Sequence, residues 1–158
     1  MSVSIRELRS TPRLRPWLDR AYAAWMNEIG AREASVAAAH TELDSALRSP
    51  GVLALIIERD QLPVGFALIR REAAGEEQRW RLLDFFVLAE MRRLGVGGAA
   101  ARLLFDRFVG DWEIVTLSKD SAALHFWRRV LARHAPGRAS ETRGAGEIVQ
   151  RFKSSGAR

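Results

Sequence analysis

Residues 84–99 have the sequence DFFVLAEMRRLGVGGA, and this stretch limits the possible folds more than any other. An apolar strand ends, a basic turn follows, and glycines open an amphipathic helix. Unpaired backbone N–H groups and the positive end of the helix dipole then lie together at the start of that helix. The turn predicts a binding site for a phosphate-bearing cofactor. Its predicted residues are Arg92, Arg93, Leu94, Gly95, Val96, Gly97, Gly98 and Ala99.

Two motifs fit these glycines. Residues 95–100 satisfy G-x-G-x-x-A, the fingerprint of dinucleotide-binding folds, and Asp120 follows at about the distance where those folds place an acid. That fingerprint needs its first glycine at the tip of the strand and further strand–helix units after it, and only about 38 residues follow Asp120. Residues 92–97 satisfy R-x-x-G-x-G with a strand before and a helix after, which is the better interpretation.

The second pattern, with its flanks, resembles the GCN5-related N-acetyltransferases (GNAT). Residues 83–87, LDFFV, resemble the fourth strand of polyamine-type members, and residues 120–127, DSAALHFW, resemble the family's N-x-x-A-x-x-F-Y segment. The resemblance covers most of the chain, with its specific motifs in residues 80–131. It implies an acyltransferase in which the glycine turn cradles the pyrophosphate of acetyl-CoA.

The order of predicted elements, β-α-α-β-β-β-α-β-α-β-β, matches the GNAT fold, a mixed α/β architecture. We expect a twisted, mostly antiparallel mixed sheet with helices on both faces. Predicted helices begin near residue 12, at residue 35, at residue 98 and after Asp120, and residues 73–79 are expected to form a polar turn. Residues 1–153 are predicted to form a single domain, followed by a disordered tail over residues 154–158. The bounded strand predictions are residues 3–8, 52–57, 64–69, 80–88, 112–117 and 148–152.

Composition excludes several classes of function. The 158-residue chain has 47% hydrophobic residues, which suits one globular domain, and it has no cysteine, which excludes disulfides, thiolate metal sites and a cysteine nucleophile. No apolar run approaches the roughly 18 residues that a membrane span needs, and the first residues lack the apolar core of a signal peptide. We therefore expect no membrane association and a cytoplasmic location.

The net charge of +6 raises the question of nucleic-acid binding. Lys119 and Lys153 are the only lysines, so 23 of the 25 basic residues are arginine, and these are scattered without a basic block. This pattern is typical of a compositional bias and disfavours a nucleic acid as partner. The three dispersed histidines do not have the spacing of a metal site, so no metal is expected.

The resemblance implies roles for two further segments. Main-chain groups of Phe86, Val87 and Leu88 would pair with pantetheine as an added strand, and the N–H of Val87 would face the thioester oxygen. Asp120, Ala123, Phe126 and Trp127 would also contact the cofactor. Most relatives have tyrosine at position 127, whose phenol protonates the leaving thiolate, whereas an indole N–H donates a hydrogen bond but is no general acid at neutral pH.

Asp84 is a single carboxylate in an apolar strand, where an acid without a role would be costly. By resemblance it lies near the acceptor amine and orients the ammonium or accepts its proton. The structural alternatives are an ion pair with an arginine and a solvent-facing position. The other predicted acceptor-site residues are Tyr22, Trp25, Glu28 and Ser118, with Glu28 and Asp84 forming an acidic pocket.

These observations favour an acetyl-CoA-dependent N-acetyltransferase that acts on a primary amine of a small molecule. Because Trp127 replaces the usual tyrosine, a catalytically weak acyl-CoA-binding sensor is the alternative from another class. A toxin-like enzyme acting on aminoacyl-tRNA is a third, and it requires the arginines to gather beside the acceptor site. Relatives often dimerise, so a homodimer is also expected.

Overall fold

The computed structural model describes residues 1–30 and 33–156, and the side chains of all of these except residues 73 and 74. Its elements follow the predicted order, with two short 3₁₀ turns before α1 and a third, η3 (Ala89–Met91), after β4. The helices are α1 (Arg15–Glu28), α2 (Val36–Arg48), α3 (Val96–Arg107) and α4 (Ser121–His134). The strands are β1 (Val3–Glu7), β2 (Val52–Arg59), β3 (Leu62–Ala74), β4 (Glu77–Val87), β5 (Gly110–Leu117), β6 (Ser140–Arg143) and β7 (Glu147–Ser154).

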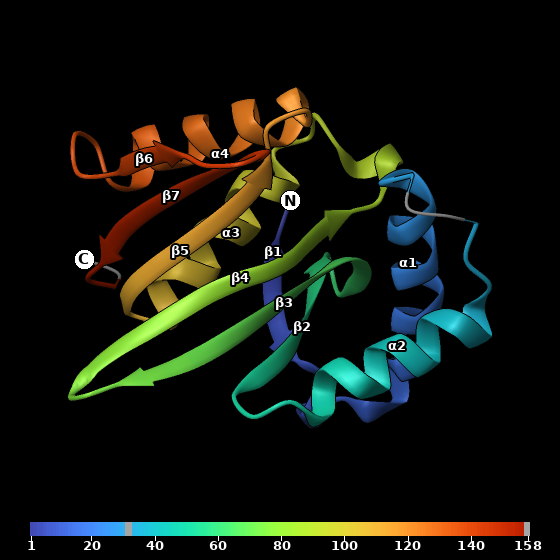
Figure 1. Ribbon diagram of the computed structural model, residues 1–158. Coiled ribbons are helices and arrows are strands. Elements are labelled where there is room, and N and C mark those ends of the chain that lie inside the picture. Colours follow the sequence, from blue (N-terminus) through green and yellow to red (C-terminus); the bar gives the residue numbers. More distant parts are fainter. Residues whose placement is uncertain (31–32, 157–158) are drawn as a thin grey trace.

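The strands form one seven-stranded sheet in the order β1-β2-β3-β4-β5-β7-β6 (Figure 1). Every neighbouring pair is antiparallel except β4 and β5, which are parallel. The predicted mixed, mostly antiparallel sheet is confirmed. The parallel pair lies in the middle of the sheet, so the carboxyl ends of β4 and β5 lie at the same edge.

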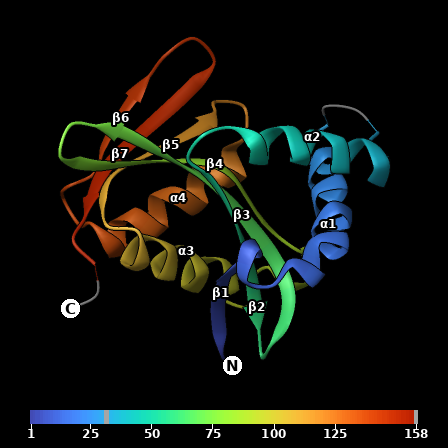
Figure 2. The ribbon, with the colours of Figure 1, turned by 90° about the horizontal axis from the view of Figure 1, so that it is seen from below.

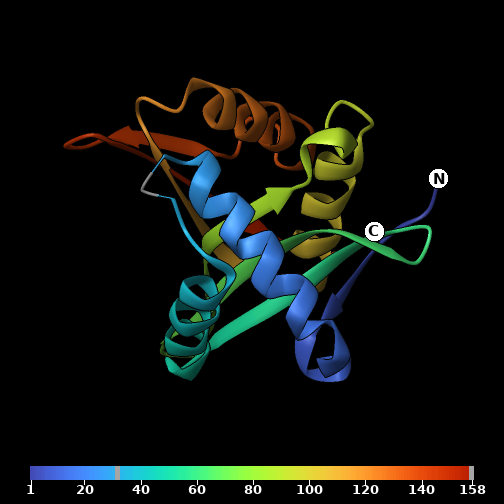
Figure 3. The same ribbon diagram turned by 90° about the vertical axis from the view of Figure 1, so that its right-hand side faces the viewer.

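Two pairs of helices cover opposite faces of the sheet (Figure 2). Apolar residues of α1 and α2, such as Leu18 and Leu43, pack against β2, β3 and β4 in one core cluster. Phe105 of α3 and Leu131 of α4 belong to a second cluster on the other face. Figure 3 shows α1 crossing in front of the sheet, with α2 beside it. Helices therefore cover both faces of the sheet, as predicted.

Several predicted boundaries are wrong, and three of them bear on the site or on the ends of the fold. Residues 73–79 are not a turn, because β3 continues to Ala74 and β4 begins at Glu77, so only two residues connect the strands. Helix α3 begins at Val96 rather than at residue 98. Ser154, predicted to begin a disordered tail, belongs to β7. It is buried, and its Oγ donates to the carbonyl of Phe105 at 2.6 Å. The last two residues of the predicted tail, 157 and 158, lie outside the described residues.

Among the described residues, no helix combines the length and the apolar character needed to cross a membrane.

Candidate active site

The strands β4 and β5 separate toward their carboxyl ends. Their ladder runs from Arg79 opposite Asp111 to Leu82 opposite Ile114 and stops there, although both strands continue (Figure 1). Residues 83–87 of β4 thus keep β3 as a neighbour on one edge and have no paired strand on the other. An extended ligand can join such an edge through main-chain hydrogen bonds.

The register of β3 and β4 identifies the main-chain groups that face this open edge. The N–H of Leu88 donates to the carbonyl of Val64 at 2.9 Å, toward β3. Successive residues of a strand direct their main-chain groups to alternate sides, so both groups of Val87 face the open edge and those of Phe86 face β3. The carbonyl of Leu88 is also engaged, since it accepts from Met91. Of the three predicted residues, Val87 alone therefore presents a free N–H there.

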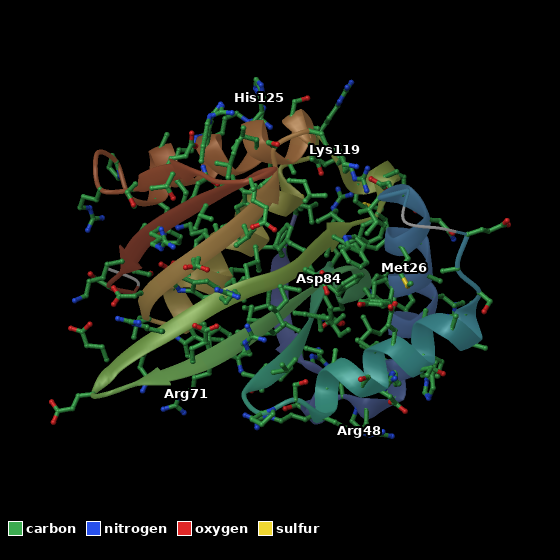
Figure 4. All side chains as sticks on the ribbon, viewed as in Figure 1. Met26, Arg48, Arg71, Asp84, Lys119 and His125 are labelled. Atoms are coloured by element: carbon green, nitrogen blue, oxygen red, sulfur yellow. The ribbon has the colours of Figure 1, made fainter. Side chains whose placement is uncertain are left out.

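A β-bulge at Leu83 determines where Asp84 points. In the ladder with β3, Leu82 lies opposite Ile69 and Asp84 lies opposite Leu68, so Leu83 is the extra residue. Leu82 packs in the core cluster of α3 and α4. The extra residue turns Asp84 to the other face, toward α1 and α2 (Figure 4). The bulge lies at the same point where β4 separates from β5.

Two carboxyl groups and a phenol interact electrostatically on this face, and we call them the acidic group. They belong to Asp84 of β4, Glu42 of α2 and Tyr22 of α1. Burial, together with the smaller effect of the negative charge of Glu42, raises the pKa of Asp84 from its ordinary value of 3.8 to about 7. Burial also raises the pKa of the Tyr22 phenol, with smaller contributions from Asp84 and Glu42. Within residues 1–30 and 33–156 Asp84 makes no ion pair with an arginine, so the ion-pair alternative finds no support there.

Glu42 is the residue that sequence reasoning missed. It is exposed on α2, and two residues near it in the same helix, Ala39 and Leu43, are fully buried. An acid one helical turn after one buried residue and directly before another lies at the border of the buried face, and that spacing was the available signal.

Glu28, which was predicted to form an acidic pocket with Asp84, has a cationic partner. Glu28 is the last residue of α1, and its carboxylate binds Arg92 instead, at 2.7 Å to one guanidinium nitrogen and 2.8 Å to the other. The Arg92 guanidinium, predicted to bind the cofactor, is thus engaged by a carboxylate in this structure. Both residues lie next to the predicted site, but they are paired with each other.

The glycine turn has the predicted form. Gly95 adopts a left-handed conformation with φ of 79°, which favours glycine, and caps the start of α3. The N–H of Ala99 donates to the carbonyl of Gly95 at 3.1 Å, so the unpaired run ends one residue earlier than predicted. The first amides of a helix have no intrahelical acceptor, which leaves those of Val96, Gly97 and Gly98 for an anion.

Gly97 and Gly98 differ in the space around them. A Cβ at Gly97 would lie 3.0 Å from the ring of Phe126, whereas a Cβ at Gly98 would have no atom within 4 Å. Gly97 therefore allows α3 and α4 to approach closely, and Gly98 borders open space. Asp120 caps α4 as predicted, since its carboxylate accepts from the N–H of Ala123 at 3.1 Å.

Trp127 lies in the hydrophobic core and is 5% exposed. Its ring makes edge-on contacts with Phe85 at 5.1 Å and Phe126 at 4.8 Å between centroids. Tyr22 is the only tyrosine of the chain, and it lies on the α1 side of the sheet, so no other phenol can replace the missing one.

The remaining acceptor-site candidates differ in position. Trp25 is partly buried, and its ring lies 5.2 Å from that of Tyr22. Ser118 is exposed just after β5, where its N–H donates to the carbonyl of Gly146. His125 is exposed on α4 and points outward (Figure 4). No cluster of three or more potential metal ligands occurs in the described part of the chain.

Comparisons with known proteins agree with this fold. The model of the acetyltransferase (GNAT) family matches residues 3–132. No curated protein sequence matches the chain. An aminoglycoside 6′-acetyltransferase type Ii has a similar structure, with a TM-score of 0.69, 16% identity and coverage of 100% of both chains.

Two further solved structures share the fold. The PaiA N-acetyltransferase of Thermoplasma acidophilum, crystallised with coenzyme A, has a TM-score of 0.61 and 14% identity over 97% of this chain and 99% of its own. An aminoglycoside acetyltransferase from an uncultured soil metagenomic sample, in complex with sisomicin, has a TM-score of 0.63 and 13% identity over 91% of each chain. The family uses acetyl-CoA, as the sequence predicted. The open edge of β4, the glycine turn and the matching family model together show that the chain belongs to the GNAT acetyltransferase family.

Proposed function

We propose that this protein transfers the acetyl group of acetyl-CoA to a primary amine of a small molecule, by direct attack within a ternary complex. The observation that carries the proposal is the placement of two groups on β4. The free N–H of Val87 faces the open edge, and the carboxyl of Asp84, three residues earlier, faces the acidic group with Tyr22 and Glu42. The N–H can donate a hydrogen bond to the thioester oxygen, and the carboxyl can bind the amine and accept its proton.

Residues of the chain fit the cofactor at two places. Pantetheine would pair with the open edge of β4, and the amides of Val96, Gly97 and Gly98 would hold the pyrophosphate at the start of α3. Acetyl-CoA supplies an activated acetyl thioester. The N–H of Val87 would donate to the thioester oxygen as that oxygen gains negative charge.

Asp84 is suited to removing the proton of the amine. A carboxyl with a pKa of about 7 is partly ionised at neutral pH and can accept a proton there. The amine nitrogen forms a bond to the acetyl carbon, the carbon–sulfur bond breaks, and the electron pair leaves with the thiolate. The proton lost by the amine goes to Asp84, directly or through a water. Glu42 adds negative charge that favours a cationic acceptor.

The leaving thiolate receives no proton from position 127. The indole of Trp127 is not an acid at neutral pH. A thiol of pKa about 8.5 leaves tolerably as the thiolate, and solvent can protonate it afterwards. Such an enzyme would be slower than one with a phenol, by about 10²-fold or more.

The burial of Trp127 also supports the second candidate, an acyl-CoA-binding sensor with little turnover. The third candidate, acting on aminoacyl-tRNA, receives less support. Its substrate is polyanionic, and the charged neighbour that shifts the pKa of Asp84 is the acid Glu42. The aminoglycoside acetyltransferases among the structural neighbours support a small cationic amine.

A screen of amines that measures free thiol released from acetyl-CoA tests the proposal. The panel should include amino acids, polyamines, aminoglycosides and an aminoacyl-tRNA, with acetyl-CoA alone as the blank. We expect release above the blank with at least one small amine. Binding of acetyl-CoA by calorimetry without release from any member would favour the sensor. Light scattering after gel filtration tests the expected homodimer, and fractionation of the source cells tests the expected cytoplasmic location.

A further inference from the structure

The pair of Glu28 and Arg92 has the geometry of a bidentate ion pair. Each carboxylate oxygen of Glu28 contacts a different terminal nitrogen of Arg92, at 2.7 and 2.8 Å. Both side chains are partly exposed, at 41% for Arg92 and 48% for Glu28. Two parallel contacts fix the plane of the guanidinium more strongly than one contact does. The pair joins the end of α1 to the turn that follows β4, 64 residues apart in sequence.

The third nitrogen of Arg92 reaches the main chain of the active site. Its Nε donates to the carbonyl oxygen of Val87 at 2.9 Å, and the guanidinium lies 5.4 Å from the ring centroid of Phe86. The carbonyl of Val87 faces the open edge, where β5 no longer supplies a donor. Arg92 therefore supplies, from a side chain, the hydrogen bond that a neighbouring strand would otherwise give.

This bond has an electrostatic consequence for the reaction. In a strand the N–H and the C=O of one residue point to the same side. A thioester oxygen that accepts from the N–H of Val87 would therefore lie near the carbonyl of the same residue, whose partial negative charge opposes the charge that develops in the reaction. A cation bonded to that carbonyl offsets the repulsion. Because both terminal nitrogens of Arg92 already bind Glu28, a phosphate could bind them only by displacing that carboxylate.

We propose that Glu28 is a positioning residue for acetyl transfer, which holds Arg92 against the carbonyl of Val87 and so prepares the adjacent N–H for the thioester oxygen. This proposal rests on the proposed function, because it assigns Val87 a role in that reaction. Arg92 is then a support of β4 rather than a ligand of the pyrophosphate, which the amides of α3 would hold.

The variant E28Q tests the proposal because three roles of Glu28 predict different results. A positioning role predicts a kcat about ten-fold lower with an almost unchanged Kd for acetyl-CoA. If the carboxylate instead competed with pyrophosphate for Arg92, E28Q would bind acetyl-CoA more tightly. If Glu28 bound the acceptor, the variant would raise the KM of the amine and leave kcat unchanged. Either of the last two results would overturn the proposal.

The variant E90Q is the matched control, since Glu90 is exposed in η3 beside the same turn and makes no ion pair among the described residues. It removes the same charge and should leave kcat unchanged. The double replacement E28R/R92E keeps an ion pair between α1 and the turn but removes the donor to Val87. We expect it not to restore kcat. Full restoration would show that the pair only ties α1 to the turn, which would contradict the proposal.

A measurement without turnover separates this proposal from the proposed function. In NMR spectra of the wild-type protein and E28Q, the carbonyl carbon and amide nitrogen shifts of Val87 report on the bond from Arg92. We expect both to change in E28Q and to stay constant in E90Q. Unchanged shifts would refute the proposal even in an active enzyme. Changed shifts in a protein that acetylates no amine would sustain the link from Glu28 to Val87 and refute the proposed function.

Discussion

Leu82 and Asp84 face opposite sides of the sheet, although only Leu83 separates them in β4. In a regular strand, residues two apart share a face. The bulge at Leu83 reverses that relation and turns the only acid of this apolar segment out of the α3–α4 core. Without the bulge, Asp84 would point into the cluster that contains Trp80 and Leu82, where a carboxylate has no partner.

The first prediction concerns the activity of D84N. If Asp84 accepts the proton of the amine, kcat/KM for the amine should fall by about 10²-fold or more, while the Kd of acetyl-CoA stays unchanged. In the wild-type protein kcat/KM should rise with pH through about 7, where Asp84 ionises, and D84N should lose this limb. Stopped assays between pH 5.5 and 9 measure both. Near-normal turnover by a folded D84N would make the carboxyl structural.

The second prediction concerns stability. The folded protein holds the proton of Asp84 up to about pH 7, whereas the unfolded chain releases it near 3.8. Between these values the folded state binds more protons, so the contribution of Asp84 to the free energy of unfolding falls as pH rises and is constant above about 7. The wild-type protein should therefore lose stability relative to D84N between pH 4.5 and 7.5. Urea unfolding of both proteins at these two pH values tests this, and a pH-independent difference would contradict it.

The third prediction concerns Glu42. E42Q removes the negative charge beside Asp84 and should raise the KM of a cationic amine several-fold with a smaller change in kcat. The ascending limb of the pH profile should move to lower pH only slightly, because burial contributes more than Glu42 to the raised pKa. E77Q, at the exposed start of β4, is the control for a lost charge at the end of that strand away from the site. If the limb moved to the pH range of an ordinary carboxyl group, Glu42 rather than burial would be the main cause of the raised pKa of Asp84.

The fourth prediction uses Gly98, because a side chain at Gly97 would press on Phe126 and confuse binding with folding. G98D places a carboxylate among the amides of the α3 N-terminus without a steric clash. An acid in the first turn suits the helix dipole, so the unliganded variant should be at least as stable as the wild-type protein. The same charge opposes pyrophosphate and should raise the Kd of acetyl-CoA at least ten-fold.

G98N is the control for the fourth prediction, since it has the same shape without the charge. Thermal shifts with increasing acetyl-CoA follow binding in all three proteins. Equal shifts in G98D and G98N would mean that the pyrophosphate lies elsewhere.

The order of elements and the glycine turn could be predicted from the sequence, because each depends on local periodicity and on residues that strongly favour one conformation. The mixed sheet was predicted from the resemblance of that order to the GNAT fold. The β3–β4 hairpin was not predictable in this way. Its far end extends beyond the helices, so both faces carry polar residues and the segment resembles a loop. Apolar alternation marks a strand only where one face is buried.

The contacts of the site were predictable only in part. Asp84 stood out as an acid among apolar residues, but the bulge that orients it has no signal in LLDFF, where apolar residues lie on both sides of the acid. Glu28 and Arg92 were each assigned to the site without their pairing. That pairing depends on where α1 ends relative to β4, which is a property of the packed fold and not of either segment.

The last prediction concerns Trp127. W127Y places a phenol at the position where the resemblance to the family implies a tyrosine, and it removes part of a buried ring that contacts Phe85 and Phe126. We expect a loss of about 1–2 kcal/mol in the free energy of unfolding from the space left behind. If protonation of the thiolate limits turnover, kcat should rise, with a new descending limb at high pH as the phenol ionises. W127F leaves a similar space without the hydroxyl and should lose stability without gaining kcat. Equal kcat values in the two variants would show that leaving-group protonation does not limit this enzyme and that Trp127 acts through packing alone.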